Sequence, residues 1–194
     1  MAKRVNMDYA PFKTTTPKLE SYYHNLLTPD DYNEKFDIGV VVDDSPECQA
    51  MIQQLLEFQN DCLTRDGRDA QDTLLNLKDE KTKDEATGKW TTPTGRQLLF
   101  FKAATRDRFA VVGADKKPMD AASISKGDTV RVNGQAAFGY MSGKPWVTLF
   151  LNAVQHISGG GASGVDAFDN EDSTGGEAEA PFEEETDTTV ADLV

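Results

Sequence analysis

Two strands and the turn between them dominate residues 129–157, which read TVRVNGQAAFGYMSGKPWVTLFLNAVQHI. Alternating apolar residues predict strands over Thr129–Tyr140 and Pro145–Ile157, joined by a hairpin loop at 141–144. Because successive side chains of a strand point to opposite faces, each strand has one core face and one outer face. In the second strand we place Val147, Leu149, Leu151 and Ala153 on one face, and Trp146, Thr148, Phe150 and Asn152 on the other.

The segment before this hairpin shows the same alternation. A strand is predicted over Arg96–Thr105, with Leu99, Phe101 and Ala103 on the core side and Phe100, Lys102 and Arg106 on the outer side. A further strand is predicted over Arg108–Val112, followed by a turn. If Val130 and Val132 face the core, Arg131 faces outward.

Further towards the N-terminus, the pattern predicts two more strands and one helix. The strands cover Leu19–Leu27 and Lys35–Val42, the latter rich in β-branched residues. Ser45 is a candidate N-cap, Pro46 suits the first helical position, and an apolar stripe then continues to a helix end before Gly67.

Two segments show no such periodicity. Met1–Pro17 is predicted to be an irregular arm. Asp66–Gly95 is polar and is predicted to be a long, partly mobile connection with a short helix at Thr73–Lys78. About five strands with one inserted helix predict a mainly β protein, a five-stranded OB-type barrel.

Composition restricts the class of protein. No apolar run is long enough for a transmembrane helix, so no membrane association is expected, and no signal peptide is recognised. Cys48 and Cys62 lie fourteen residues apart, outside any metal-binding spacing. We expect both to be buried free thiols in a reducing, intracellular compartment.

The formal charge of −13 is unevenly distributed. Residues 158–194 contain eleven acids and no Lys or Arg, whereas Gly88–Ile157 contains ten bases and four acids. Three parts are predicted: an OB domain at 1–157, a Gly-rich linker at 158–164 and a disordered acidic tail at 165–194. Residues 88–157, the candidate binding half, therefore carry a net positive charge that the total of −13 conceals.

Catalytic patterns are weak. His24 and His156 have no partner at a metal-ligand spacing, and Gly88-Lys89-Trp90 does not form a phosphate loop. Paired acids at Asp30-Asp31 and Asp43-Asp44 leave a metal-dependent nuclease as one alternative, although adjacent acids at strand ends are usually turn residues. We predict no catalytic residue, no metal and no cofactor.

A stronger pattern combines aromatic and basic residues on the outer strand faces. Single-stranded DNA offers base faces for stacking and phosphates for cations, so an interface for it needs exposed rings beside Lys or Arg. The alternation leaves open which of Tyr22 and Tyr23 faces DNA. The candidate DNA-binding residues are Tyr22, Tyr23, Phe100, Lys102, Arg106, Arg108, Arg131, Tyr140, Lys144, Trp146 and Phe150.

In its order of elements the chain resembles the single-stranded DNA-binding proteins of T7-like podoviruses. The matching elements are the strand 36–42, the helix opening Asp44-Ser45-Pro46-Glu47-Cys48-Gln49, the segments 100–103 and 109–120, and the hairpin 130–157 with its linker and acidic tail. The resemblance implies an OB fold without catalysis and a role in phage replication, recombination and repair in the cytoplasm of the infected bacterium. It also implies base stacking by an aromatic of the Tyr140/Trp146 hairpin, and a possible homo-oligomer.

The acidic tail has two predicted uses. A tethered polyanion competes with DNA for a cationic groove and can also bind basic proteins. The resemblance implies replication partners such as a DNA polymerase or helicase-primase, although this tail ends on Asp192-Leu193-Val194 rather than on an aromatic. Candidate partner-binding residues are Asp166, Phe168, Asp169, Phe182, Glu183, Glu184 and Glu185. An adaptor that uses the tail while its barrel binds protein is a second alternative.

Overall fold

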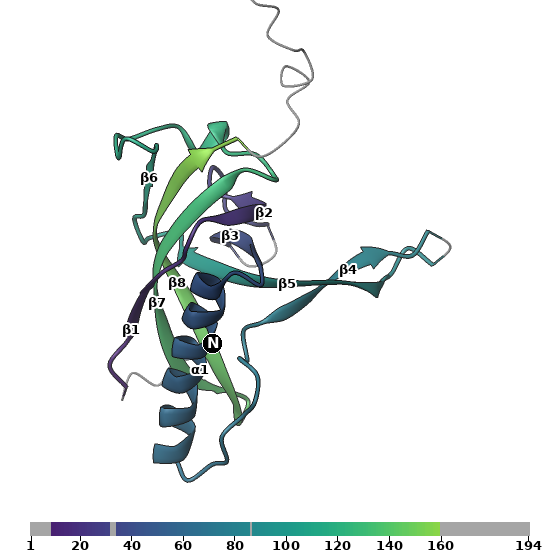
Figure 1. Cartoon of the computed structure of the whole chain (residues 1–194), viewed down its shortest axis with the longest axis vertical. Helices are drawn as coiled ribbons and strands as arrows, with labels where there is room; N and C mark the ends of the chain where they lie inside the picture. Colours follow the sequence, from purple (N-terminus) through teal and green to yellow (C-terminus); the bar gives the residue numbers. More distant parts are fainter. Residues whose placement is uncertain (1–8, 32–33, 86, 160–194) are drawn as a thin grey trace, which may run out of the picture. The chain divides into compact units, whose positions relative to one another are not determined.

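A computed structural model describes residues 9–31, 34–85 and 87–159, and the predictions for the acidic tail lie outside these residues (Figure 1). Within them, strands predominate and α1 is the single α-helix. The elements are β1 Phe12–Thr15, β2 Leu19–Asn25, β3 Lys35–Val42, α1 Pro46–Arg65, β4 Lys78–Lys83, β5 Trp90–Ala104, β6 Ala110–Val112, the 3-10 turn η1 Ala121–Ser123, β7 Thr129–Met141 and β8 Lys144–Ser158.

Five of these strands close into a ring. β2 pairs with β3, β3 with β5, β5 with β8, β8 with β7 and β7 again with β2. All of these pairs are antiparallel except β5–β8, which is parallel. β1 and β6 add to β7 and β8. The predicted mainly β fold, with five strands of OB type and one helix inserted between early and late strands, is confirmed.

The core fills the inside of this ring. Leu99, Phe101 and Ala103 are buried as predicted, and so are Val147, Leu149 and Leu151. Burial of each large apolar side chain contributes about 1.5–3 kcal/mol, so this face supplies much of the stability. Val130 and Val132 are also fully buried and leave Arg131 exposed, as expected.

The prediction for Ala153 is wrong. Asn133 pairs with Ala153 but Gly134 pairs with Leu151, so β8 has one additional residue between them. This bulge reverses the alternation, and Val154 is buried in place of Ala153. At the bulge, a Cβ on Gly134 would lie 2.4 Å from the Phe150 carbonyl oxygen and 2.8 Å from the Phe101 ring. Only glycine allows β7 and β8 to approach this closely.

Helix α1 follows the prediction at both ends. Ser45 Oγ accepts a hydrogen bond from the Cys48 amide at 3.3 Å, Pro46 opens the helix, and Asp66 ends it. Cys48 and Cys62 are buried and free, and they pack with Leu55 in the core. No helix in the described ranges is long and apolar enough to cross a membrane.

Two predictions for non-periodic segments are wrong. Within the expected irregular opening, Phe12–Thr15 forms β1 against β7. The predicted helix at 73–78 is a turn closed by the Leu77 amide on the Leu74 carbonyl, after which β4 begins. β4 pairs with the first half of β5 to make a two-stranded arm that projects from the ring (Figure 1). Both arm faces meet solvent, so its sequence lacks the apolar alternation of a half-buried strand.

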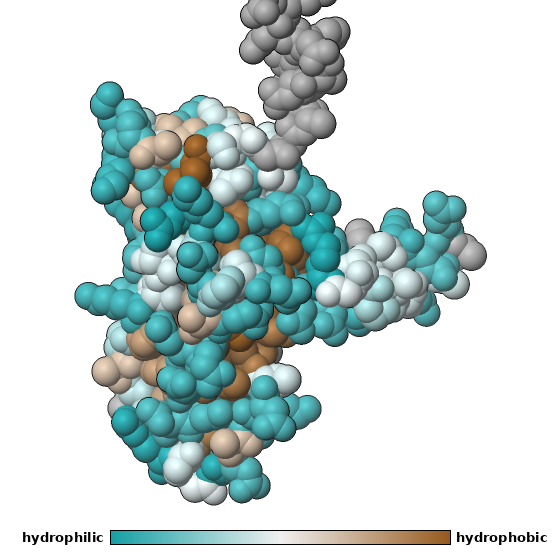
Figure 2. Space-filling view, in the orientation of Figure 1, coloured by the Kyte–Doolittle hydropathy of each residue, from teal (hydrophilic) through white to brown (hydrophobic). Residues whose placement is uncertain are grey.

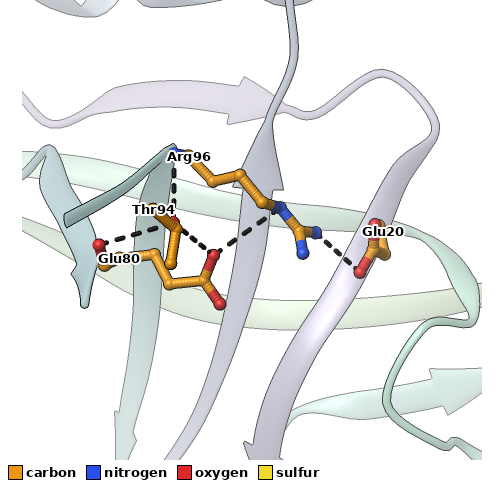
Figure 3. A network of polar contacts seen from close by, with 4 residues as sticks. All are labelled: Glu20, Glu80, Thr94 and Arg96. Carbon is orange, nitrogen blue, oxygen red and sulfur yellow. Dashed lines mark hydrogen bonds and ion pairs between the residues drawn. The ribbon is translucent and has the colours of Figure 1, made fainter. Parts of the chain in front are cut away.

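A polar network braces the base of this arm (Figure 3). Arg96 Nη2 lies 2.7 Å from Glu20 Oε1 on β2, and Arg96 Nε lies 3.8 Å from Glu80 Oε2. The Thr94 hydroxyl donates to the same Glu80 oxygen at 2.7 Å. Glu80 is only 9% exposed. Through Glu80 and Arg96, the network joins both arm strands to β2 of the ring.

Candidate nucleic-acid interface

A cavity of about 280 Å³ lies on the outer surface of the ring. It is lined from β3, the start of β4, β5, β7 and β8, so segments far apart in the chain form it. Four aromatic side chains and three lysines converge there. The lining residues are Lys35, Asn76, Lys78, Phe100, Lys102, Gly139, Tyr140, Met141, Trp146, Val147, Thr148, Leu149 and Phe150.

Strand register creates this grouping. The parallel pair β5–β8 places Lys102 opposite Phe150, and the antiparallel pair β7–β8 places Trp146 opposite Gly139. Phe100, Trp146 and Phe150 are half-buried, with the core residues Phe101 and Leu149 on the reverse face. The predicted outer face of β5 and β8 thus forms one wall of flat rings beside lysine.

Phe100 is held in place from several sides. Its ring lies over Gly39 of β3, where a Cβ would come within 2.8 Å of the Phe100 ring. The Lys78 ammonium lies 5.3 Å from the Phe100 ring centroid, within the range of a cation–π contact. Desolvation at this position lowers the pKa of Lys78, and the charge of Lys102 lowers it further. Two neighbouring lysines therefore repel each other here, which favours an anionic ligand.

The buried carboxylate of Asp37 lies beside Lys102 of this wall. Asp37, 2% exposed, lies 3.9 Å from Lys102 Nζ, and it accepts hydrogen bonds from the Tyr23 hydroxyl at 2.9 Å and Asn25 Nδ2 at 3.2 Å. Desolvation raises the pKa of Asp37, while these hydrogen bonds and Lys102 oppose the shift. The network orients Lys102 and leaves its ammonium group partly exposed.

Tyr140 lines the cavity but is anchored outside it. Its hydroxyl donates to the Asp66 carboxylate, which also accepts from the Tyr9 hydroxyl. The Arg68 guanidinium lies 4.7 Å from the Tyr140 ring centroid. These hydrogen bonds lower the pKa of Asp66, that from Tyr140 more than that from Tyr9. Tyr140 is therefore a fixed part of the wall, connected to the end of α1.

Several predicted residues do not line the cavity. Tyr23 flanks it, with its ring centroid 6.3 Å from that of Phe100. Tyr22 instead lies beneath the Lys126 ammonium, 4.8 Å from the centroid. Arg131 lines a different groove, with Lys13 and Lys18. Exposed Arg106, Arg108 and Lys144 are absent from the lining.

Sequence reasoning missed Lys35, Asn76 and Lys78, which line the cavity, and Asp37, which lies beside Lys102. Lys35 and Asp37 alternate with the apolar Phe36 and Ile38, so their outer position could have been predicted. No comparable signal existed for Asn76 and Lys78, because they precede or begin a strand that was expected to be part of a connection. Their place in the cavity depends on the pairing of β4 with β5.

In the described ranges, the side chains considered for catalysis make structural contacts. His24 Nε2 lies 2.7 Å from the Ile124 carbonyl oxygen, and His156 Nε2 lies 3.0 Å from Asp128. Asp43 caps the start of α1 by accepting from the Ser45 hydroxyl at 2.6 Å. Within residues 9–31, 34–85 and 87–159, no three His, Cys, Asp or Glu side chains are grouped as metal ligands would be.

The topology and the outer wall define an OB-type ring with an aromatic and cationic cavity. Comparison with solved structures finds this fold in phage proteins. The single-stranded DNA-binding protein from bacteriophage Enc34 has a TM-score of 0.57 and 15% identity, over 82% of this chain and 88% of that one. The same protein in complex with ssDNA gives a TM-score of 0.56 and 14% identity, over 75% and 86%.

The single-stranded DNA-binding protein gp2.5 encoded by bacteriophage T7 gives a TM-score of 0.54 and 15% identity, over 84% of this chain and 97% of that one. No protein-family model and no curated protein sequence matches the chain. The resemblance to phage single-stranded DNA-binding proteins, inferred from the order of elements, is thus confirmed at the level of the fold.

Proposed function

We propose that this protein binds single-stranded DNA with little sequence preference and without catalysis. The observation that carries the proposal is the convergence of Phe100, Trp146 and Phe150 with Lys35, Lys78 and Lys102 around one cavity. Aromatic rings stack on any base, and ammonium groups neutralise phosphates, so neither contact requires a particular sequence.

We assign each cavity residue a role in DNA binding from its position. Phe150 and Trp146 on β8, with Phe100 on β5, supply the stacking surfaces. Lys102 is held by Asp37, and Lys78 by the Phe100 ring, so both ammonium groups are ordered before the strand arrives. Ordered groups lose less conformational entropy on binding, which favours affinity. The similarity to phage proteins that bind ssDNA supports the same function.

The biological setting is also part of the proposal. We infer that the protein protects single strands during phage replication, recombination and repair in the host cytoplasm. The acidic tail would compete with DNA for cationic groups and recruit replication proteins. Its eleven acids and lack of Lys or Arg support this role.

Titration of labelled oligo-dT with the full chain and with residues 1–157, at several salt concentrations, tests the proposal. We expect binding that weakens steeply with salt, and tighter binding for the truncated chain at low salt. Absence of oligo-dT binding by both would reject the function and favour the adaptor alternative. Degradation of the oligonucleotide that depends on Mg²⁺ would instead indicate a nuclease.

A further inference from the structure

The arm formed by β4 and the first half of β5 begins at the cavity. Asn76 and Lys78 line the cavity, and the same strand then continues into the arm through Lys81 and Lys83. At about 3.3 Å per residue, Lys83 lies roughly 16 Å along the strand from Lys78. A polynucleotide that leaves the cavity beside Lys78 therefore meets the arm next.

The exposed surface of the arm is rich in lysine and threonine. On the face that Figure 2 shows, the coloured residues of the arm are hydrophilic or intermediate, whereas hydrophobic residues gather on the body of the ring. Lys81, Lys83 and Lys89 are exposed, as are the hydroxyl residues Thr91 and Thr92. Within the described part of the chain, none of these three ammonium groups lies within 4 Å of a carboxylate oxygen.

The acids of the arm lie at its base, where Asp79 and Glu80 stand, and at its tip, where Asp84 and Glu85 stand. Glu80 is buried in the brace with Arg96 and Thr94. Asp84 accepts from the Thr87 amide at 2.8 Å in the turn at the arm tip. Asp79 lines a separate hollow with Asp43 and Asp44. The sides of the arm therefore present lysines, while the carboxylates lie at its base and tip.

The arm also has a fixed direction. Two-stranded hairpins are marginally stable on their own, and the side chains that the structure describes in this one form no apolar face. The Glu20–Arg96–Glu80–Thr94 network supplies an anchor at its base instead (Figure 3). An anchored cationic ribbon orders phosphates at a lower entropic cost than a free one.

We propose that the β4–β5 arm is a second nucleic-acid contact, which binds the phosphates of the strand where it leaves the cavity. This inference rests on the proposed function of the cavity and adds a site to it. Lys81 and Lys83 donate to phosphate oxygens, with Lys89 on the returning side of the turn. The ligand is a single strand longer than the cavity can hold.

The test compares the double variant Lys81→Gln/Lys83→Gln with the charge-matched control Lys116→Gln/Lys117→Gln, which alters two exposed lysines of the turn after β6. Binding is measured by fluorescence anisotropy for a pentanucleotide and for an oligonucleotide of about twenty residues. For the longer strand, the arm variant should lose about ten-fold in affinity near 0.1 M salt. Its slope of log K against log salt should fall by about 1.4, which is 0.7 for each lost phosphate contact.

The pentanucleotide should bind the arm variant and the wild type equally, and the control should match the wild type for both lengths. Equal affinities and slopes of arm and control variants on the longer strand would overturn the arm site while leaving the cavity function intact. Loss of affinity for both lengths would also overturn it, because the lysines would then act on the cavity itself. If the wild type bound neither strand, the proposed function itself would fail.

Discussion

Lys102 and Phe150 lie directly opposite each other in the parallel register of β5 and β8. Parallel pairing of strands so far apart in the sequence depends on closure of the ring. It places an ammonium group beside an aromatic ring on the outer face, while the neighbouring pair, Phe101 and Leu149, faces the core. The candidate interface is therefore a direct consequence of the strand order.

Replacing Phe150 with Leu should weaken binding of single-stranded DNA at least about five-fold, because a base loses its flat stacking partner, worth roughly 1–3 kcal/mol per base. Phe109→Leu is the matched control, since Phe109 packs on Phe36 with ring centroids 5.2 Å apart and does not line the cavity. Anisotropy titrations measure both. Equal losses in the two variants would mean that Phe150 does not stack on DNA.

Removing three cavity lysines should lower the salt dependence of binding. Lys35→Gln/Lys78→Gln/Lys102→Gln should reduce the slope of log K against log salt by about 2, at 0.7 per phosphate contact. The charge-matched control is Arg106→Gln/Arg108→Gln/Lys144→Gln, whose residues do not line the cavity. A larger effect in the control would favour the interface predicted from the sequence over the cavity.

Asp37→Asn should weaken DNA binding up to about five-fold, because Lys102 loses the carboxylate that holds its ammonium group in place. Burial raises the pKa of Asp37, so the folded state holds this proton more tightly than the unfolded state. Wild-type stability should therefore decrease as the pH rises through and above the ordinary aspartate pKa, and the variant should lack this contribution.

Thermal unfolding of the wild type, Asp37→Asn and Asp44→Asn is measured across this pH range. Asp44→Asn is the control for loss of an exposed carboxylate. The difference in Tm between Asp37→Asn and wild type should grow in favour of the variant as the pH rises. A constant difference would show that Asp37 carries no destabilising charge.

Tyr140→Phe keeps the ring but removes its hydrogen bond to Asp66. We expect lower thermal stability and a several-fold loss of DNA affinity, because the ring is no longer fixed in the cavity wall. Tyr9→Phe removes the other hydrogen bond to Asp66 and should affect stability alone. If both variants changed DNA affinity equally, Asp66 would act on the fold rather than on the position of Tyr140.

The two thiols should be unreactive in the native protein. Burial raises the pKa of Cys48 and raises that of Cys62 to about 11, so neither forms the reactive thiolate near neutral pH. Reaction with a chromogenic disulfide should proceed at the rate of unfolding and accelerate in denaturant. Rapid native-state labelling of either residue would contradict its burial.

Local sequence patterns predicted most of the ring. The alternation in Arg96–Thr105 identified Phe100 and Lys102 as outer residues, and Ser45-Pro46 identified the start of α1. These features succeed because each depends on neighbouring residues: side-chain alternation in a strand, and capping at a helix end. The bulge beside Gly134 was missed, because its cause is close contact with Phe150 and Phe101 rather than a local preference.

The sequence by itself determined which side chains face outward on β5 and on β8 before its bulge, and that most of the net negative charge belongs to residues 158–194. Only the tertiary structure decided which outward residues meet. Ring closure joined Phe100 and Lys102 to Trp146 and Phe150, and pairing of β4 with β5 brought in Lys78, while Arg106 and Arg108 were left outside. Alternation is a property of one strand, whereas a site on a sheet depends on the order and register of several strands.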